Sequence, residues 1–236
     1  MDSAESIIKS IKGMVTPIRH EGIPFIAGCV FVALFFGWFW QPLLWLGLIV
    51  AGWCTYFFRD PRRVTPLEPG LVVSPADGRV AAVSIGVAPK ELGLGEQTRR
   101  RVSIAMSMFD CHVNRAPIGG RISRIVYTPG KLLSGEVDKA SPSNERNAIV
   151  FDSAHGPVGV VQTAGLVARR IVCFTKEGAE LAPGERIGLI RFGSRLDVFL
   201  PVAATVVVAE GQTAIAGETA IARFGAPAGE RTVRID

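Results

Sequence analysis

The distribution of apolar and polar positions divides the 236-residue chain into an apolar N-terminal part and a longer part of mixed polarity. Apolar residues recur at helical spacing in residues 1–21, which predicts a short amphipathic helix that ends near Pro17. Residues 22–58 contain no charged side chain, and residues 59–70 are rich in Arg and Pro, as expected of a linker. In residues 71–236, short β-branched runs are separated by Gly and Pro, which predicts strands and turns.

Residues 22–58 are too long to be a single membrane-spanning helix. A helix of 37 residues would measure about 55 Å, whereas the hydrocarbon core of a bilayer is about 30 Å thick. The sequence WFWQP at residues 38–42 interrupts the stretch, so we expect a membrane hairpin of two helices, which either spans twice or is re-entrant. Basic residues flank both ends and favour the cytoplasmic side. A cleaved signal peptide would have a shorter apolar core. The preceding amphipathic helix either lies in the membrane interface or packs on the globular domain.

The β-rich part contains three segments of similar pattern, beginning at Val73, Ala116 and Ala164. Each has a small turn and an alternating strand, and the last two end in a second turn. Repeated hairpins of this kind predict a mainly β, barrel-sandwich-like domain, similar to biotinyl and lipoyl modules. Asp138-Lys139 is the nearest match to a lipoyl-bearing hairpin tip, but it lies in a long polar stretch, residues 131–146, that reads as a loop.

Charge and cysteine content narrow the classes of function. The net charge is +5, and residues 1–21 sum to zero, so the excess lies in the Arg-rich remainder. This positive charge indicates either that the domain binds an anionic ligand or surface, or that it has a basic face exposed to solvent. No zinc-finger spacing, RNA-binding aromatic signature or basic groove-binding helix is present, so we expect no nucleic-acid partner. The four cysteines contain no C-x-x-C pair, which excludes a zinc site of that type and a disulfide framework.

Three positions are candidates for chemistry. His112 follows an apolar run and is the best general acid or base of the three histidines. Asp77 is either a turn residue or a carboxylate that orients a histidine. Gly193-Ser194 interrupts a strand-like run, residues 187–201. The pair is either a β-bulge or a strained peptide bond beside a nucleophilic hydroxyl.

These residues belong to a series of motifs that occur in a fixed order behind the hydrophobic hairpin. The motifs are Ser74-Pro-Ala-Asp77-Gly78, His112-x-x-Arg115-Ala-Pro117, Tyr127-x-Pro-Gly130, Asn144-Glu-Arg-Asn147 and Arg191-Phe-Gly-Ser194-Arg-x-Asp197. With them, residues 57–201 resemble the short, membrane-associated bacterial phosphatidylserine decarboxylases.

The resemblance implies a self-processing enzyme of the bacterial inner membrane, with its catalytic domain on the cytoplasmic side. It implies cleavage between Gly193 and Ser194 into a β chain, residues 1–193, and an α chain, residues 194–236. Ser194 would become a pyruvoyl group, and neither a metal nor pyridoxal phosphate is expected. This group would form a Schiff base with phosphatidylserine in the membrane and release CO₂ and phosphatidylethanolamine. The two chains of one precursor would stay together, and a homo-oligomer is left open.

The resemblance also implies roles for individual residues. It assigns decarboxylation to His112 and assistance in self-cleavage to Asp77 with a histidine. A second histidine of the longer bacterial form is replaced here by Arg115. Either His112 therefore serves both steps, or Asp77 acts without a histidine, while Arg115 is free to hold a phosphate or carboxylate. Two other functions stay open: a pyruvoyl decarboxylase of a free amino acid, and a non-enzymatic membrane-tethered adaptor in which Gly193-Ser194 is a bulge.

Overall fold

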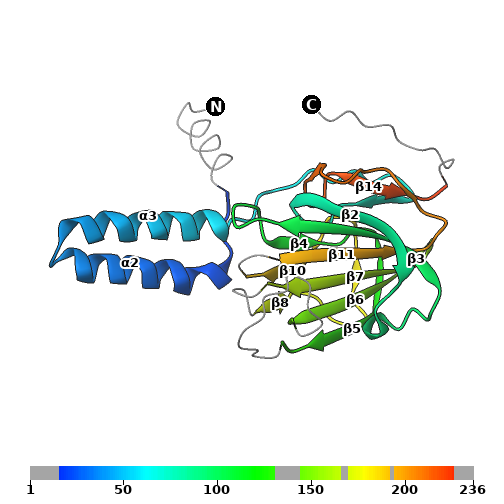
Figure 1. Cartoon of the computed structure of the whole chain (residues 1–236), viewed down its shortest axis with the longest axis horizontal. Coiled ribbons are helices and arrows are strands. Elements are labelled where there is room, and N and C mark those ends of the chain that lie inside the picture. The colour runs from blue at the N-terminus through cyan, green and yellow to red at the C-terminus, as the bar shows by residue number, and fades with distance from the viewer. Residues whose placement is uncertain (1–15, 131–143, 166–169, 192–193, 226–236) are drawn as a thin grey trace, which may run out of the picture. The chain divides into compact units, whose positions relative to one another are not determined.

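The computed structural model describes residues 16–130, 144–165, 170–191 and 194–225, with Ser194 described by its backbone (Figure 1). The chain divides into two compact units, Met1–Arg62 and Arg63–Asp236. Most of the predicted amphipathic helix and the Asp138-Lys139 loop lie outside the described residues.

The first unit is a pair of antiparallel helices, α2 (Ile23–Gly37) and α3 (Gln41–Phe57), preceded by the short 3₁₀ helix η1 (His20–Gly22). A proline in the first turn of each helix is compatible with helix initiation, because the first N–H groups have no partner inside the helix. The helices approach closely at Gly47, where an added methyl group would overlap the side chain of Ala33. At 1.5 Å per residue, α2 is about 22 Å long and α3 about 26 Å long.

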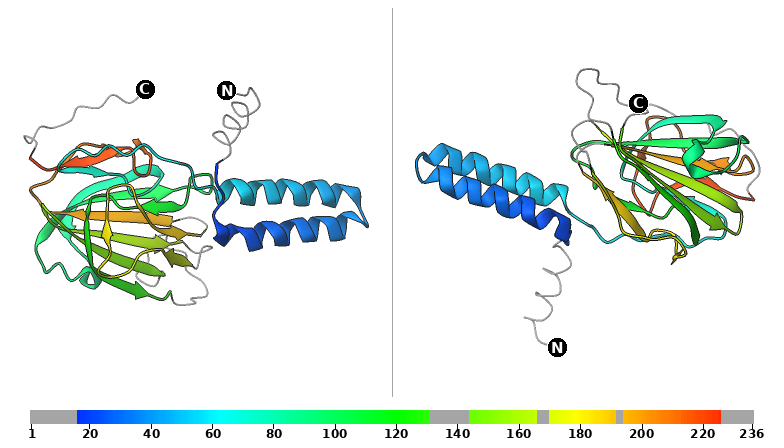
Figure 2. Two further views of the ribbon diagram at one scale, coloured as in Figure 1. Left: turned by 180° about the vertical axis from the view of Figure 1, so that it is seen from behind. Right: turned by 90° about the horizontal axis from the view of Figure 1, so that it is seen from below.

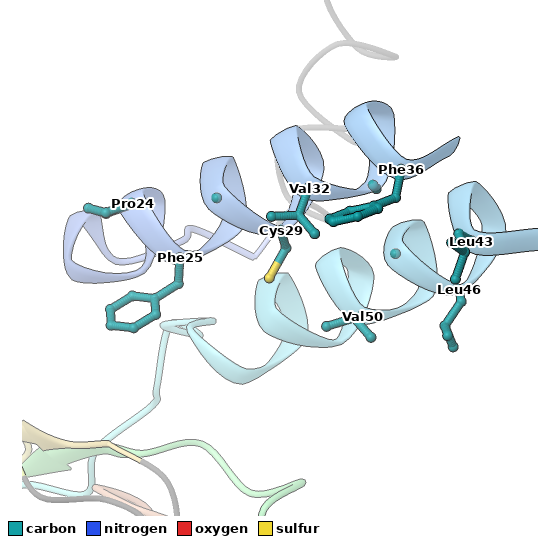
Figure 3. Close-up of a pocket in the computed structure, with 11 residues that line it drawn as sticks. Pro24, Phe25, Cys29, Val32, Phe36, Leu43, Leu46 and Val50 are labelled. Carbon is teal, nitrogen blue, oxygen red and sulfur yellow. The ribbon is translucent and has the colours of Figure 1, made fainter. Parts of the chain in front are cut away.

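The outer surface of the hairpin is apolar. Phe31, Trp38 and Ile49 are 70, 88 and 69 % exposed, and a groove of about 700 Å³ between the helices is lined mainly by apolar residues such as Val32 and Phe36 (Figure 3). So large an exposed apolar surface is typical of a membrane or protein contact. By length and composition, the continuous helix His20–Gly37 can cross a membrane, although a signal sequence has the same properties.

The base of the hairpin is tied together by residues from both of its ends. The backbone N–H of Asp60 donates to the carbonyl of Pro17, at 2.7 Å, and the N–H of Arg19 donates to the carbonyl of Phe58, at 2.9 Å. Arg19 also forms an ion pair with the buried Asp60, at 3.6 Å. The start of the expected linker is therefore part of the hairpin unit.

The second unit is mainly β, as predicted, and all strand pairs among its described residues are antiparallel. Its largest sheet has eight strands and is strongly curled (Figure 2). In spatial order these are β13 (Thr213–Ala214), β2 (Gly78–Val87), β3 (Thr98–Met106), β11 (Ser194–Leu200), β7 (Gly156–Ala164), β6 (Arg146–Ser153), β5 (Gly120–Thr128) and β9 (Glu180–Leu181).

Two three-stranded sheets complete the domain. The first contains β4 (Val113–Arg115), β10 (Arg186–Ile190) and β8 (Ile171–Cys173), in that order, and the second contains β1 (Leu71–Val73), β14 (Ala220–Arg223) and β12 (Thr205–Val206). The main core lies on the inner face of the curled sheet and includes Ile104, Leu196 and Val198. A smaller cluster that includes Phe199 and Val161 packs against Leu92 of the 3₁₀ helix η2 (Lys90–Leu92).

The structure corrects one expectation about residues 187–201, which the sequence pattern presents as a single strand interrupted by Gly193-Ser194. The run forms two strands that belong to different sheets: β10 lies between β4 and β8, and β11 lies between β3 and β7. Apolar alternation cannot reveal this change, because both strands are buried and have the same period.

Candidate active site

Position 194 is the first residue of the central strand β11. Its Cα is paired with Met106, the last residue of β3, and with Ala164, the last residue of β7. The pairing continues for seven residues on the β3 side and six on the β7 side. The backbone that begins at Ser194 is therefore held on both sides by hydrogen-bonded neighbours.

The end of β10 is held separately, on the other side of residues 191–193. The N–H of Ile190 donates to the carbonyl of His112, at 3.2 Å, and Ile190 is paired with Ile171 of β8. Residues 191–193 thus connect two sheets, and residues 192 and 193 lie outside the described part of the chain. Ile190 and Ser194 are four residues apart, and four residues of extended chain span at most about 14 Å. The backbone of His112 is therefore hydrogen-bonded to a residue that lies no more than about 14 Å from Ser194.

His112 is fully buried at the start of β4. Its Nδ1 lies 2.9 Å from the carbonyl oxygen of Asp110. Because a carbonyl can only accept, Nδ1 carries a hydrogen, and in the neutral form of the ring the lone pair would be on Nε2. The carboxylate of Asp110 accepts the N–H of Ser107, at 2.6 Å, and so fixes the turn between β3 and β4. The turn brings His112 back beside the end of the strand that pairs with Ser194.

A chain of buried amides crosses the inner face of the sheet near position 194. Asn147 donates to Gln162 Oε1, at 2.9 Å, and Gln162 donates to Asn114 Oδ1, at 2.8 Å. Asn114 Nδ2 in turn lies 3.7 Å from the sulfur of Met106. The three amides are at most 1 % exposed, so each contact replaces a hydrogen bond to water. Gln162 is paired with Leu196, two residues after Ser194, and the amides connect β6 and β7 with β4.

The carboxylate of Asp77 has two partners from other segments. Arg63 Nη2 donates to its Oδ2, at 2.6 Å, and the N–H of Ala216 donates to its Oδ1, at 2.8 Å. The contacts described for this carboxylate do not include His112. Its role in self-cleavage therefore stays a prediction, and the structure shows it joining the start of the domain to the loop after β13.

Arg115 is also buried, at 6 % exposure. Its Nη1 donates to the carbonyl of Gly184, at 2.9 Å, and its backbone N–H donates to the carbonyl of Pro75, at 2.8 Å. Alternation along β4 separates it from Asn114, whose side chain joins the amide chain. The guanidinium that replaces the second histidine thus binds a backbone carbonyl on another segment, which does not favour a role as a ligand for a lipid phosphate.

The motifs around Tyr127 and Asn144 come together through Glu145. The buried carboxylate of Glu145 accepts the N–H of Ile171 in β8, at 2.7 Å, and a hydrogen bond from the Tyr127 side chain. Burial, this hydrogen bond and the nearby negative charge raise the pKa of the Tyr127 phenol above its ordinary value. Glu145 therefore ties β8, which pairs with the end of β10, to the edge of the large sheet.

On the opposite face of the sheet, a second polar group accompanies β11. The carboxylate of Asp197 accepts a short hydrogen bond from the hydroxyl of Ser103 in β3. It also forms an ion pair with Arg195, in which Nε and Oδ2 are 3.1 Å apart. Asp197 is 4 % exposed and Ser103 is 2 % exposed. Asp197 and Arg195 belong to the motif that contains Ser194. The hydrogen bond from Ser103 to Asp197 joins two residues that are paired across β3 and β11, and so it stabilises this register.

Sequence reasoning missed Asn114, Gln162 and Ser103. The signal that could have found Gln162 is a long polar side chain inside the apolar run of β7, where a buried amide requires partners. Asn114 stands at an unspecified position of the motif between His112 and Arg115, where the sequence gives no signal for it. No group of three or more His, Cys, Asp or Glu side chains in the described ranges could hold a metal ion.

A comparison with protein families extends these observations to most of the chain. A family model described as phosphatidylserine decarboxylase matches residues 50–222, which include every one of the motifs above. The match covers more than half of the 236 residues, from within α3 to within β14. The chain therefore belongs to the phosphatidylserine decarboxylase family, and it is a carboxy-lyase that acts on phosphatidylserine.

Proposed function

We propose that the chain is made as a precursor that cuts itself between Gly193 and Ser194 and then decarboxylates phosphatidylserine with a pyruvoyl group derived from Ser194. The observation that carries the proposal is the passage of residues 191–193 from one sheet to another. The peptide bond before Ser194 lies in a short connection whose two ends are held by different neighbours.

The strand pairing is compatible with a cut at this place. The C-terminal fragment would contain β11 to β14, and β11, β13 and β14 each pair with a strand of the N-terminal fragment. Since β11 is hydrogen-bonded on both sides in the middle of the large sheet, the two fragments would stay associated after cleavage. Only the connection between the two sheets would be released.

The chemistry of the cut requires a nucleophile and a base. The hydroxyl of Ser194 would attack the carbonyl carbon of Gly193 and lose its proton, and the C–N bond would break as the nitrogen takes up a proton, leaving an ester. Loss of the Cα proton would expel the Gly193 carboxylate and leave dehydroalanine. Tautomerisation and addition of water would then release ammonia and leave the pyruvoyl group. His112 suits the role of base, because its Nδ1–H is committed to Asp110 and its lone pair lies on Nε2.

A pyruvoyl group at position 194 would supply a carbonyl that forms a Schiff base with the amine of phosphatidylserine and withdraws the electron pair left by CO₂. The fully buried His112 would hold the proton at Nε2 that is delivered to the decarboxylated carbon. The amide chain from Asn147 to Asn114 holds β4, and with it His112, against the sheet. These residues fit the group, since Gln162 is paired with Leu196, two residues after position 194, and Asn114 contacts Met106, which is paired with position 194.

The substrate lies in a membrane, and the apolar hairpin provides a means to reach it. The exposed aromatic and aliphatic side chains of α2 and α3 would be immersed in the bilayer as a hairpin, with the catalytic domain on the cytoplasmic side of a bacterial inner membrane. A soluble amino-acid substrate would not require such a segment, which favours the lipid over a free amino acid.

Intact-mass measurement and gel electrophoresis of the purified protein test the self-cleavage. We expect two chains, the smaller corresponding to residues 194–236 with a blocked amino terminus, and a single uncut chain for Ser194→Ala. Ser84→Ala serves as the control, because Ser84 lies on β2, away from the cut, and should leave processing intact. A wild-type protein that stays uncut and still decarboxylates phosphatidylserine would disprove the pyruvoyl mechanism.

A second pair of variants separates the two possible bases. If His112 serves both steps, His112→Ala should abolish cleavage while Asp77→Asn still matures. If Asp77 acts without a histidine, Asp77→Asn should stay uncut while His112→Ala matures and fails to release CO₂. Assaying CO₂ release from phosphatidylserine in detergent micelles and from free serine then identifies the substrate.

A further inference from the structure

A polar cavity lies on the outer side of the large sheet, beneath the connection between β2 and β3. It has a volume of about 390 Å³, and its wall includes Leu92, Arg99, Ser123, Arg124, Asp152 and Pro157. This size is within the range of cavities that bind small molecules. We call it the Arg99 cavity.

Arg99 is the unusual residue of this cavity. It is only 6 % exposed, and burial lowers the pKa of its guanidinium, although arginine stays charged in proteins. Its Nη1 donates to the carbonyl of Pro157, at 2.8 Å, while its buried Nε has no hydrogen-bond partner. No carboxylate in the described residues forms an ion pair with it. A buried, uncompensated charge is costly, so a bound anion would supply what the chain does not.

The remaining charges of the Arg99 cavity come from Arg124 and Asp152. Arg124 donates through Nε to the carbonyl of Glu91, at 3.0 Å, and no described carboxylate pairs with its guanidinium. The carboxylate of Glu91 is instead engaged by Arg146, at 2.7 Å. Asp152 accepts the hydroxyl of Ser123, at 3.1 Å. The wall thus presents two guanidinium groups and one separate carboxylate, which together match a ligand that carries both an anion and a cation.

The Arg99 cavity is remote from the candidate active site. Arg99 is seven residues from Met106 along β3, and Pro157 is seven residues from Ala164 along β7. At about 3.3 Å per residue, the cavity lies about 23 Å from the row that contains Ser194. It also lies on the outer face of the sheet, on the side of Asp197 and Phe199 rather than of Gln162.

We propose that the Arg99 cavity binds a small phosphate ester that also carries an ammonium group, with the phosphate on Arg99 and Arg124 and the ammonium on Asp152. Guanidinium groups bind phosphate through paired, charge-assisted hydrogen bonds, and a phosphate would satisfy the unpartnered Nε of Arg99. The Asp152 carboxylate disfavours a bare anion and favours the zwitterion. The site is independent of self-cleavage, because none of its residues belongs to the connection at residues 191–193.

Isothermal titration calorimetry on the full chain in detergent tests the proposal, with phosphoethanolamine and inorganic phosphate as probes at constant ionic strength. We expect phosphoethanolamine to bind more tightly than phosphate. Arg124→Gln and Arg99→Met should each weaken both probes by about tenfold or more, since each removes charge-assisted hydrogen bonds. Asp152→Asn should weaken phosphoethanolamine and strengthen phosphate, because it removes an attraction for one and a repulsion for the other.

Two controls make the outcome decisive. Arg79→Gln removes an exposed arginine of β2 that is paired with Ala105, at the end of β3 away from Arg99, and should leave both affinities unchanged. Ser194→Ala should also bind normally, which separates this site from the pyruvoyl mechanism. The proposal is overturned if neither probe binds, if Arg79→Gln weakens binding as much as Arg124→Gln, or if Asp152→Asn shifts both probes in the same direction. If Arg99→Met does not fold, the Arg124 and Asp152 variants still decide the matter.

Discussion

Replacing Gln162 by leucine tests whether the buried amide chain holds the sheet around the candidate active site. Leucine is close to glutamine in size, so the change leaves little cavity. It does remove the acceptor of Asn147 and the donor to Asn114, which lie 2.9 and 2.8 Å from the glutamine amide. Both partners are at most 1 % exposed, so water cannot replace the lost contacts without a structural change.

The expected loss of stability follows from the two side-chain amides, of Asn147 and Asn114, that would lose their hydrogen-bond partner. Leaving a buried polar group unsatisfied costs about 1–3 kcal/mol, so Gln162→Leu should lower the free energy of unfolding by about 2–6 kcal/mol. That is a large fraction of the roughly 5–15 kcal/mol that stabilises a typical domain. Replacing Asn114, Gln162 and Asn147 together by leucine should cost less than the sum of the three single changes, because no partner is then left unsatisfied.

Urea unfolding followed by far-ultraviolet circular dichroism measures the effect. The experiment uses a Ser194→Ala background, in which the chain is expected to stay in one piece. Tryptophan fluorescence is unsuitable, because all four tryptophans lie in the hairpin. Gln97→Leu, at an exposed position, is the matched control and should change stability by less than about 0.5 kcal/mol. Equal stability of the Gln162 and Gln97 variants would refute the reasoning.

Three further outcomes are expected. Glu145→Gln should lower the pKa of the Tyr127 phenol towards its ordinary value of about 10, as measured by phenolate absorbance, and a rise would contradict the assigned cause. With Glu145 in place, the raised folded-state pKa means that the stability Tyr127 contributes is present below the unfolded-state pKa and is lost as the pH rises through the folded-state value. Gly188→Ala should destabilise the domain by about 1–3 kcal/mol in thermal unfolding, because the added methyl would lie 2.7 Å from a carbonyl oxygen of β8; an unchanged melting temperature would show that this contact relaxes. Ile49→Asp should reduce flotation with phosphatidylserine-containing vesicles, whereas Ile85→Asp, at an exposed position of β2, should not; equal flotation of both variants would exclude the hairpin as the anchor.

The sequence pattern predicted the class of each part of the chain but not how the strands combine. Alternating β-branched runs and Gly turns identified a β-rich domain, and the absence of charge in residues 22–58 identified a helical hairpin. Both signals are local, since they depend on side chains within a few positions of one another. The split of residues 187–201 into β10 and β11 depends on pairing with His112, Ile171, Met106 and Ala164, which no local pattern contains.

The environment of the candidate residues was likewise decided by tertiary contacts. Sequence motifs selected His112 and Asp77, but the structure gives the first a buried ring with a fixed tautomer and the second an ion pair with Arg63. Asn114 and Gln162 are 48 residues apart in sequence, and their amides can form a hydrogen bond only because the fold brings β4 and β7 together.

By itself, the sequence determined that the protein has an apolar hairpin, a mainly β domain and a Gly-Ser pair in a set of ordered motifs. These features follow from hydrophobic periodicity and from residue identity, which are properties of the chain alone. Only the tertiary structure decided that the chain passes from one sheet to another directly before Ser194, that β11 lies between two long strands, and that Arg99 is buried beside a cavity with no counterion among the described residues. The physical reason is that burial, pairing and the compensation of charge depend on residues that are distant in sequence and become neighbours when the chain folds.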